Sequence, residues 1–195
     1  MSRIVAGRRG GQRLVMPPHD RTRPTSDRVR ESAFNLIAAW AGTAGEPADT
    51  QLDRFSFLDL FAGSGAVALE AASRGAGPVV AVEKDAPTAS VARRNVSTLG
   101  LAVDVVVSSV DAYLAERARR PFDIVWLDPP YALDSDAVAR VGARIVESGW
   151  LAGDGLIVTE RSARDVAPPW PTVLRNTWSR RYGETTLYFA TQEVE

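Results

Sequence analysis

Residues 57–65, Phe-Leu-Asp-Leu-Phe-Ala-Gly-Ser-Gly, decide the fold of this 195-residue chain. An apolar run that contains one acid, Asp59, leads into a glycine-containing turn, and a helical segment follows. Glycines allow the backbone to approach a ligand closely, and the amino terminus of the helix offers free N–H groups to an anionic group. The spacing Gly63-x-Gly65-x-x-Ala68 also satisfies the fingerprint of dinucleotide-binding proteins. The stretch therefore predicts the first strand–turn–helix unit of a nucleotide-binding α/β fold and leaves the ligand open.

Around this unit, apolar runs alternate with helical segments. Strands are predicted over residues 55–61, 78–82, 103–108, 122–127 and 155–160, and helices over 65–74, 86–99, 110–119 and 134–148. Strands that are apolar throughout, such as 78–82 and 122–127, are typical of a parallel sheet covered on both faces. Residues 172–180 and 185–191 predict an antiparallel hairpin appended to that sheet. We therefore expect an α/β protein with a mostly parallel sheet.

The amino-terminal part predicts a small hairpin followed by a helix. Short strands over residues 3–6 and 12–16 are separated by glycines. From Ser26 to Trp40 the apolar residues fall on one helical face, with Ser26 or Asp27 as the N-cap. Residues 41–54 are small and polar, which is typical of a surface linker.

Positive charge is concentrated at the start of the chain. Residues 1–30 carry eight arginines and two acids, a balance of +6 that leaves −7 for residues 31–195, since the whole chain has −1. Such asymmetry predicts an arm that binds a polyanion, with a solvated basic terminus as the alternative.

Composition excludes several kinds of chemistry. The sequence has no cysteine, so disulfides, thiolate metal sites and Cys-His catalysis are excluded. The single histidine, His19, lies in the basic segment far in sequence from the strand-end loops, so we expect no Ser-His-Asp catalysis either. No stretch approaches the ~20 apolar residues of a membrane span, and the arginine-containing N-terminal segment lacks the apolar region of a secretory signal. We therefore expect a cytoplasmic protein with no metal and no membrane partner.

The tetrapeptide Asp128-Pro129-Pro130-Tyr131 follows the apolar run 122–127. The lone pair of a base –NH₂ is drawn into the ring, so the nitrogen is a poor nucleophile until acceptors hold its hydrogens. The Asp128 side chain and the Pro129 carbonyl supply two acceptors, and the two prolines stiffen the loop. Tyr131 offers a surface on which an extruded base stacks. The tetrapeptide predicts methylation of an exocyclic amine, with an ordinary proline-rich turn as the alternative.

Carboxylates are predicted to gather at one edge of the sheet. Asp59, Asp111 and Asp128 lie at or shortly after strand ends, and Glu83 ends the second strand. Ligands of open α/β folds bind at this carboxyl-end edge, where an acid such as Glu83 reaches ribose hydroxyls. These carboxylates would repel a pyrophosphate but favour S-adenosylmethionine, which carries a sulfonium and an ammonium. Asp111 also fits the cap of a helix.

Four motifs occur in one order: RPTSDRVRESAFN at 23–35, FLDLFAGSGAVALEA at 57–71, DPPY at 128–131 and RRYGETTLYF at 180–189. Through them the chain resembles, nearly end to end, the RsmD-type family of bacterial ribosomal RNA guanine-N2 methyltransferases. The resemblance implies a Rossmann-like class I methyltransferase fold of seven strands with a small N-terminal β-hairpin extension. It also implies S-adenosylmethionine as methyl donor and a guanine of 16S RNA, in an assembled or assembling 30S particle, as acceptor.

The resemblance also assigns residues to roles. The catalytic residues that hold the guanine amine are Asp128, Pro129, Pro130 and Tyr131. The cofactor-binding residues are Asp59, Phe61, Gly63, Gly65, Glu83, Asp111, Thr25 and Arg30, with Glu83 at the ribose and Asp111 at the adenine. The charge asymmetry, rather than the motifs, adds the expected RNA-binding residues Arg3, Arg8, Arg9, Arg13 and Arg23. The implied organisation is a basic RNA-binding arm over 1–25 and a methyltransferase domain over 26–195, acting as a monomer.

Three alternatives stay open. A DNA adenine or cytosine amino-methyltransferase shares the loop, although 195 residues leave no separate target-recognition domain. A protein-glutamine methyltransferase gives no role to the arginine-rich arm. A non-catalytic ribosome assembly factor could bind RNA and retain the fold.

Overall fold

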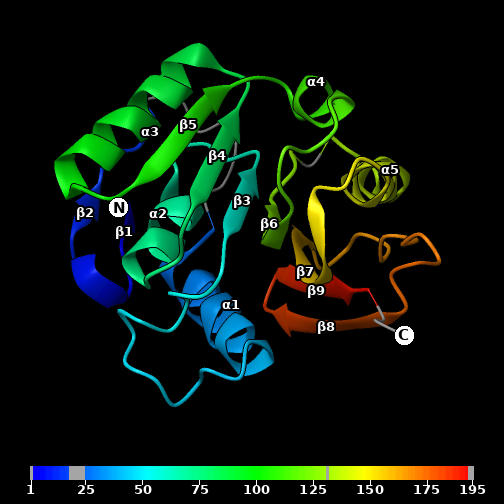
Figure 1. Ribbon diagram of the computed structural model, residues 1–195, viewed down its shortest axis with the longest axis horizontal. Helices are drawn as coiled ribbons and strands as arrows, with labels where there is room; N and C mark the ends of the chain where they lie inside the picture. Colours follow the sequence, from blue (N-terminus) through cyan, green and yellow to red (C-terminus); the bar gives the residue numbers. More distant parts are fainter. Residues whose placement is uncertain (1, 18–24, 131, 193–195) are drawn as a thin grey trace.

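A seven-stranded sheet forms the centre of the computed structural model, which describes residues 2–17, 25–130 and 132–192 (Figure 1). In spatial order its strands are β5 (Val103–Val107), β4 (Val79–Glu83), β3 (Phe57–Leu60), β6 (Phe122–Leu127), β7 (Leu151–Ser162), β9 (Thr185–Thr191) and β8 (Asn176–Tyr182). The run from β5 to β7 is parallel, whereas β9 is antiparallel to both β7 and β8. The predicted mostly parallel sheet with a C-terminal antiparallel hairpin is therefore confirmed.

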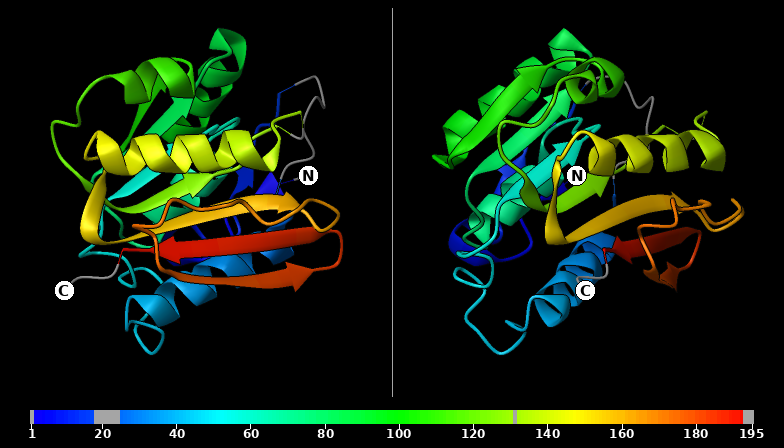
Figure 2. Two further views of the ribbon diagram at one scale, coloured as in Figure 1. Left: turned by 90° about the vertical axis from the view of Figure 1, so that its right-hand side faces the viewer. Right: turned by 45° about the vertical axis from the view of Figure 1, so that its right-hand side comes forward.

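Helices cover both faces of this sheet (Figures 1 and 2). They are α1 (Asp27–Trp40), α2 (Ala66–Ser73), α3 (Ala86–Leu99), α4 (Val110–Ala115) and α5 (Ser135–Glu147). Phe57 and Trp126 pack in one buried cluster with α1 and α2, whereas Leu58 and Leu127 pack in another with α4 and α5. Neighbouring residues of a strand point to opposite faces, so uniformly apolar strands feed both clusters.

Helix ends follow the capping residues of the sequence. The Ser26 hydroxyl accepts a hydrogen bond from Val29 N at 3.3 Å, and Asp85 caps α3 by accepting from Thr88 N at 2.9 Å. Gly100 ends α3 with φ of 60°, a conformation that glycine adopts without strain. These predicted caps are confirmed.

Several predicted features differ from the structure, and three of them have a visible physical reason. The helix predicted over 110–119 ends at Ala115, because the Glu116 carbonyl accepts from the Trp150 indole at 3.1 Å instead of continuing the helix. The strand predicted from 172 begins at Asn176, since Leu174 N closes a turn onto Pro171 O. The linker 41–54 has no helix or strand, but it is not purely a surface segment: Leu52 is buried in the core.

The amino-terminal hairpin lies against α2 and α3. It consists of β1 (Ser2–Arg3), the 3-10 turn η1 (Gly7–Arg9) and β2 (Arg13–Leu14). Ile4 and Leu14 of the hairpin form a small buried cluster with Leu69 and Leu99 of the two helices. Gly7 has φ of 80°, and a Cβ there would lie 2.1 Å from the Ser73 carbonyl oxygen, so only glycine allows this approach.

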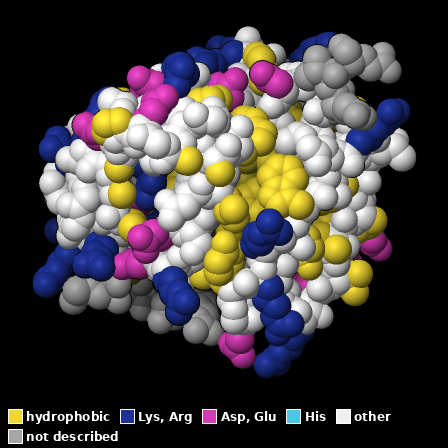
Figure 3. All heavy atoms as spheres, turned by 90° about the horizontal axis from the view of Figure 1, so that it is seen from below, with side chains coloured by type: hydrophobic (Ala, Val, Ile, Leu, Met, Phe, Trp, Pro, Cys, Tyr) yellow, Lys and Arg dark blue, Asp and Glu magenta, His cyan; other side chains and the backbone are white. Residues whose placement is uncertain are grey.

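The side of the molecule formed by α1 and the β8–β9 hairpin is partly apolar. Seen from below, hydrophobic side chains gather on this side, with basic side chains among them (Figure 3). Leu36 and Trp40 of α1 and Trp178 of β8 are partly buried residues that pack against the larger core cluster. Trp178 stacks on Phe189 of the neighbouring strand at 5.1 Å, so the terminal hairpin is anchored through its inner aromatic face.

Candidate active site

Four acids stand on four consecutive strands at the carboxyl-end edge of the sheet. Glu83 ends β4, Asp59 lies in β3, Asp128 follows β6 and Glu160 lies in β7. The pairing of Leu127 with Thr159 places Asp128 and Glu160 next to each other. Glu160 was not among the predicted residues, although it stands at the end of the predicted strand 155–160, as Asp128 does after 122–127. That position is the signal that could have identified it.

Asp111 is not part of this row. Its side chain is 83% exposed and pairs with Arg144 across 3.1 Å. The cap of α4 is the Ser109 hydroxyl, which accepts from Ala112 N, so Asp111 occupies the first turn instead. The expected contact between Asp111 and the adenine of S-adenosylmethionine stays a prediction.

Asp59 is a buried carboxyl group aimed at the start of α2. Its Oδ2 accepts one hydrogen bond, from Ala68 N at 3.0 Å, and the residue is 1% exposed. Burial raises the pKa of Asp59 to about 8, with the Ala68 bond opposing the rise and the charge of Glu83 adding to it. A cationic group placed beside it would restore the charged form, so this position suits an ammonium.

The turn after β3 is held in a strained conformation. Phe61 has φ of 68°, and Gly63 and Gly65 have φ of 56° and 79°. The Glu83 carboxylate accepts from Gly63 N at 2.9 Å and from Asp85 N at 2.8 Å, which ties the turn to the end of β4. A left-handed conformation costs about 1–2 kcal/mol for a residue with a side chain, and such strain clusters at ligand-binding positions.

Asp128 is half-buried and stands at the start of the proline-rich loop. Leu133 N donates to Pro130 O at 2.9 Å, and the Leu133 carbonyl in turn accepts from Arg161 of β7 at 2.6 Å. Burial raises the pKa of Asp128 well above its ordinary value, and the charges of Glu160 and Asp59 add to the rise. Hydrogen bonds thus hold Pro130 and Leu133 in place, and the Asp128 carboxylate is a stronger base than an exposed one. Tyr131 lies outside the described residues.

Glu160 links three parts of the chain that are distant in sequence. Its carboxylate accepts from the Thr25 hydroxyl at 2.6 Å and from the hydroxyl of Thr185 at the start of β9. Thr25 Oγ1 also lies 3.3 Å from Asp128 Oδ2. Burial raises the pKa of Glu160, while Thr25, the charge of Arg30 and Thr185 oppose the rise. The motifs around Thr25, Asp128 and Thr185 therefore meet at one carboxylate.

Arg30, predicted to contact the cofactor, is fully buried beneath the start of α1. Its guanidinium pairs with Asp27 at 2.8 Å, lies 3.8 Å from Glu70, and donates to the carbonyl oxygens of Thr25 and Arg3. These partners belong to the protein itself, and a contact of Arg30 with a cofactor stays a prediction.

Glu70 of α2, a residue that sequence reasoning missed, fastens the hairpin to the domain. Its fully buried carboxylate accepts from the backbone N of Val5 at 2.6 Å and of Ala6 at 3.0 Å. It also pairs with Arg74 Nε at 2.9 Å. An acid in the middle of a helix gives no sequence signal for such a contact.

The predicted RNA-binding arginines are divided between two places. Arg3 lies beside the start of α1, where its side chain, 64% exposed, pairs with Asp27 at 3.3 Å. Arg8 and Arg9 lie at the opposite, amino-end edge of the sheet, where the chain enters β4 and β5. Arg13 is exposed on β2, and Arg23 lies outside the described residues. The structure therefore does not bring these arginines together with the carboxylates.

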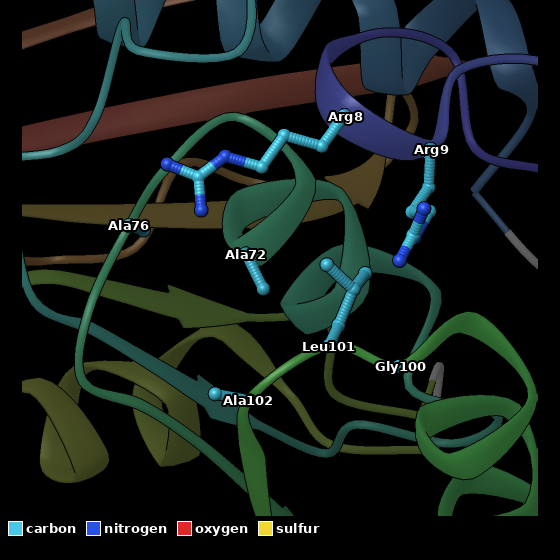
Figure 4. Close-up of a pocket in the computed structure, with 7 residues that line it drawn as sticks. All are labelled: Arg8, Arg9, Ala72, Ala76, Gly100, Leu101 and Ala102. Atoms are coloured by element: carbon cyan, nitrogen blue, oxygen red, sulfur yellow. The ribbon is translucent and has the colours of Figure 1, made fainter.

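Arg8 and Arg9 border a pocket of about 350 Å³ (Figure 4). The pocket is lined otherwise by small and apolar residues, namely Ala72, Ala76, Gly100, Leu101 and Ala102. Arg8 extends over the pocket, whereas Arg9 points down toward Gly100 and Leu101 and donates from Nε to the Leu99 carbonyl at 2.6 Å.

A seven-stranded sheet of this order, with a glycine turn after β3 and an acid-headed DPP loop after β6, defines a class I methyltransferase. The family described as Conserved hypothetical protein 95 matches residues 2–191. Ribosomal RNA small subunit methyltransferase D of Escherichia coli K12 is 34% identical over 170 residues, which cover 87% of this chain and 79% of that protein. The chain belongs to this family, the RsmD-like methyltransferases.

Other relatives agree with this membership. Ribosomal RNA small subunit methyltransferase D of Haemophilus influenzae is 32% identical over 162 residues, covering 81% of this chain and 77% of that protein. A solved structure from Escherichia coli superposes with a TM-score of 0.83 and 30% identity over 100% of this chain and 99% of that one. The 16S rRNA N2 G1207 methyltransferase of Thermus thermophilus, solved with AdoMet and guanosine, has a TM-score of 0.64 at 21% identity, covering 88% of this chain and 44% of that one. This last likeness concerns the fold alone.

The described part of the chain offers neither a cluster of metal ligands nor a membrane-spanning helix. Among residues 2–17, 25–130 and 132–192, no group of three or more His, Cys, Asp or Glu side chains is placed to hold a metal ion. Within the same ranges, no helix combines the length and the apolar character needed to cross a membrane.

Proposed function

We propose that this methyltransferase transfers a methyl group from S-adenosylmethionine to the exocyclic N2 of a guanine in 16S ribosomal RNA, within an assembled or assembling 30S particle. The observation that carries the proposal is Asp128: a proton-accepting carboxylate at the head of a stiff proline loop, at the ligand-binding edge of the sheet. Relatives named as small-subunit methyltransferases support the choice of RNA.

Two residues of the acidic row, by which we mean Glu83, Asp59, Asp128 and Glu160, fit S-adenosylmethionine. Asp59, buried with a single hydrogen bond, matches the ammonium of the methionine part, and Glu83 at the end of β4 matches ribose hydroxyls. The strained turn from Phe61 to Gly65 leaves room for a ligand, since a Cβ at Gly63 would meet no atom within 4 Å. When bound, the cofactor supplies a methyl group on an activated sulfonium.

The chain's own part in the reaction is to position the amine and take its proton. The Asp128 carboxylate and the Pro129 carbonyl accept the two N–H groups, which aims the nitrogen lone pair away from the ring. The C–N bond forms as the C–S bond breaks, and the nitrogen then loses a proton to Asp128. Such placement of acceptors where charge develops is the main source of catalysis expected here.

The RNA contacts of the proposal rest on the arginines of the hairpin. Among the described residues, Arg8 forms no ion pair with an acid, and the Arg9 guanidinium donates to the Leu99 backbone carbonyl. Because these two lie at the far edge of the sheet, RNA that reaches them and the DPP loop must span the molecule. A folded ribosomal particle offers such a surface more readily than a short strand. The basic arm over 1–25, the monomeric state and the cytoplasmic location stay predictions.

The test is methyl transfer from labelled S-adenosylmethionine to 30S particles from a strain that lacks the gene. Asp128→Ala is expected to reduce the rate by about 10²–10³-fold, as removal of a transition-state hydrogen-bonding group does. Asp154→Ala, at an exposed acid in the first part of β7, is the matched control and is expected to retain full activity. Digestion of the labelled RNA then identifies the modified base.

Other outcomes separate the alternatives. Full activity of Asp128→Ala would refute the assignment of the loop. Label in duplex DNA or in protein, with none in 30S particles, would favour one of the other amino-methyltransferase classes. Binding of 30S particles without binding of S-adenosylmethionine, measured by calorimetry, would favour a non-catalytic assembly factor.

A further inference from the structure

The hydroxyl of Thr25 lies between two carboxyl groups. Its Oγ1 is 2.6 Å from Glu160 Oε2 and 3.3 Å from Asp128 Oδ2. A threonine hydroxyl has one hydrogen and two lone pairs. The short contact takes the hydrogen, because a neutral donor bonds a carboxylate at such a distance. The oxygen therefore meets Asp128 with a lone pair, and a good hydrogen bond forms there when Asp128 carries a proton.

The surroundings of the pair make the uptake of one proton favourable. Glu160 faces the Arg30 cation of α1 and the Thr185 hydroxyl of β9, whereas Asp128 faces the Asp59 carboxyl of β3 and the Arg161 cation of β7. Glu160 is buried and Asp128 is half-buried. Each carboxyl group raises the cost of charging the other. Adjacent carboxyl groups of this kind titrate as a pair.

We propose that Glu160 is a positioning residue for methyl transfer and that it shares, through the Thr25 hydroxyl, the proton that Asp128 takes from the target amine. This inference rests on the proposed amine methylation. The nitrogen lone pair forms the N–CH₃ bond while the C–S electron pair passes to sulfur. The N–H electron pair stays on nitrogen, and the proton moves to Asp128. The protonated Asp128 then donates a hydrogen bond to Thr25 Oγ1. The hydroxyl hydrogen of Thr25 stays on its oxygen and is donated to the Glu160 carboxylate.

The arrangement explains why three distant motifs meet here. Thr25 comes from the segment before α1, Asp128 from the loop after β6, and Thr185, which also holds Glu160, from the terminal hairpin. Without Glu160, the hydroxyl of Thr25 would turn its hydrogen toward Asp128 and occupy the lone pair that the amine needs. Glu160 thus keeps Asp128 free to accept a proton from substrate.

The first experiment measures single-turnover methyl transfer against pH for wild type, Glu160→Gln, Thr25→Val and Thr25→Ser. In Glu160→Gln we expect the rate to fall by about ten- to a hundredfold, within the range of a general acid–base contribution. The acid limb of its profile moves to lower pH, because Asp128 loses a negative neighbour. Thr25→Val shows a similar loss of rate, whereas Thr25→Ser restores it. Glu147→Gln, an exposed acid of α5, is the control.

A purely structural role of Glu160 gives a different pattern. It would lower the melting temperature and the folded fraction, with an unchanged pH profile for the molecules that fold. That outcome, or a Glu160→Gln enzyme with the rate and profile of wild type, overturns the proposal.

A second measurement does not depend on turnover. Infrared difference spectra across a pH titration report protonated carboxyl groups, and the Asp59→Asn background removes the signal of Asp59. The midpoint for Asp128 is expected to fall by about one pH unit or more when Glu160→Gln is added, since a like charge has been removed. An unchanged midpoint refutes the shared proton even in a protein that methylates nothing. A shifted midpoint without methylation of guanine refutes the proposed function alone.

Discussion

Two buried glutamates of this protein, Glu70 and Glu160, stand in opposite electrostatic surroundings. Glu70 in α2 is bonded by two backbone N–H groups and by Arg74, with Arg30 at 3.8 Å, so its charge is fully matched. Glu160 in β7 is bonded by two hydroxyls and stands beside a second acid, Asp128. A carboxylate surrounded by cations and donors holds parts together, whereas one placed next to another acid is poised to exchange a proton.

Arg30 connects the two surroundings. Its buried guanidinium lies near Glu70, and its charge also stabilises the ionised form of Glu160. The cation that fastens the amino-terminal hairpin is therefore the one that sets the charge balance at the acidic row. The comparison predicts that changes at Glu70 affect stability, and that changes at the row affect pH dependence and chemistry.

The largest effect of a single substitution on stability that does not depend on pH is expected for Glu70→Gln. The substitution removes the negative charge that lies beside the buried Arg30 and Arg74 guanidinium groups. Removing one partner of a buried ion pair costs about 3–5 kcal/mol. Urea denaturation followed by circular dichroism measures the loss. The exposed acid Glu147 provides the control, since Glu147→Gln is expected to change stability by less than about 0.5 kcal/mol.

The same variant also tests the division of roles. Among folded Glu70→Gln molecules, affinity for S-adenosylmethionine is expected to equal that of wild type, because Glu70 lies outside the acidic row. A stable variant with weakened cofactor binding would contradict the comparison.

The next effect is a pH dependence of stability caused by Asp59. Its pKa rises from 3.8 to about 8 on folding, so the folded state binds the proton more tightly than the unfolded state does. Stability supplied by this proton is complete below about pH 4 and is lost as pH rises toward 8, by up to about 1.4 kcal/mol per pH unit. Asp59→Asn has no such proton to lose. The stability of Asp59→Asn relative to wild type is therefore expected to increase between pH 5 and 8.

Denaturation curves of the two proteins at several pH values measure this difference directly. A difference that stays constant with pH would show that Asp59 is ionised in the folded protein. In the same series, Asp59→Asn is expected to bind S-adenosylmethionine more weakly than wild type, since the variant offers no charge to the ammonium.

The sequence was sufficient for what depends on local pattern. Uniformly apolar strands predicted the parallel sheet, and Ser26, Asp85 and Gly100 predicted helix ends because capping is decided within four residues. Asp59, Glu83 and Asp128 were found because strand ends meet at one edge. Asp111 follows the same rule along the chain, but α4 turns it outward to Arg144.

The residues that sequence reasoning missed depend on long-range pairing. Glu160 and Thr25 are 135 positions apart, and Glu70 and Val5 are 65 apart. No periodicity records which buried carboxylate meets which distant donor. The positions of Arg8 and Arg9 were also beyond prediction, because the path of the hairpin over α2 is set by Glu70 and by the close approach of Gly7 to Ser73.

The smallest effect is expected on RNA affinity, when Arg8 and Arg9 of the amino-terminal hairpin are replaced. Glu70 holds this hairpin in place. If Arg8 and Arg9 bind RNA phosphates, replacing both with Ala weakens 30S binding by only about fivefold near physiological salt, because exposed contacts to phosphate are screened. The salt dependence is the sharper measure: the slope of log K against log salt should fall by about 1.4 for two lost contacts. Arg117→Ala with Arg119→Ala removes equal charge after α4 and should leave the slope nearly unchanged. Equal slopes for the two double variants would show that net charge alone steers binding. A smaller slope in the Arg8 and Arg9 double variant, but not in the Arg117 and Arg119 double variant, would show a direct contact with RNA. Glu70, which fixes the hairpin, would then also fix a contact with the substrate.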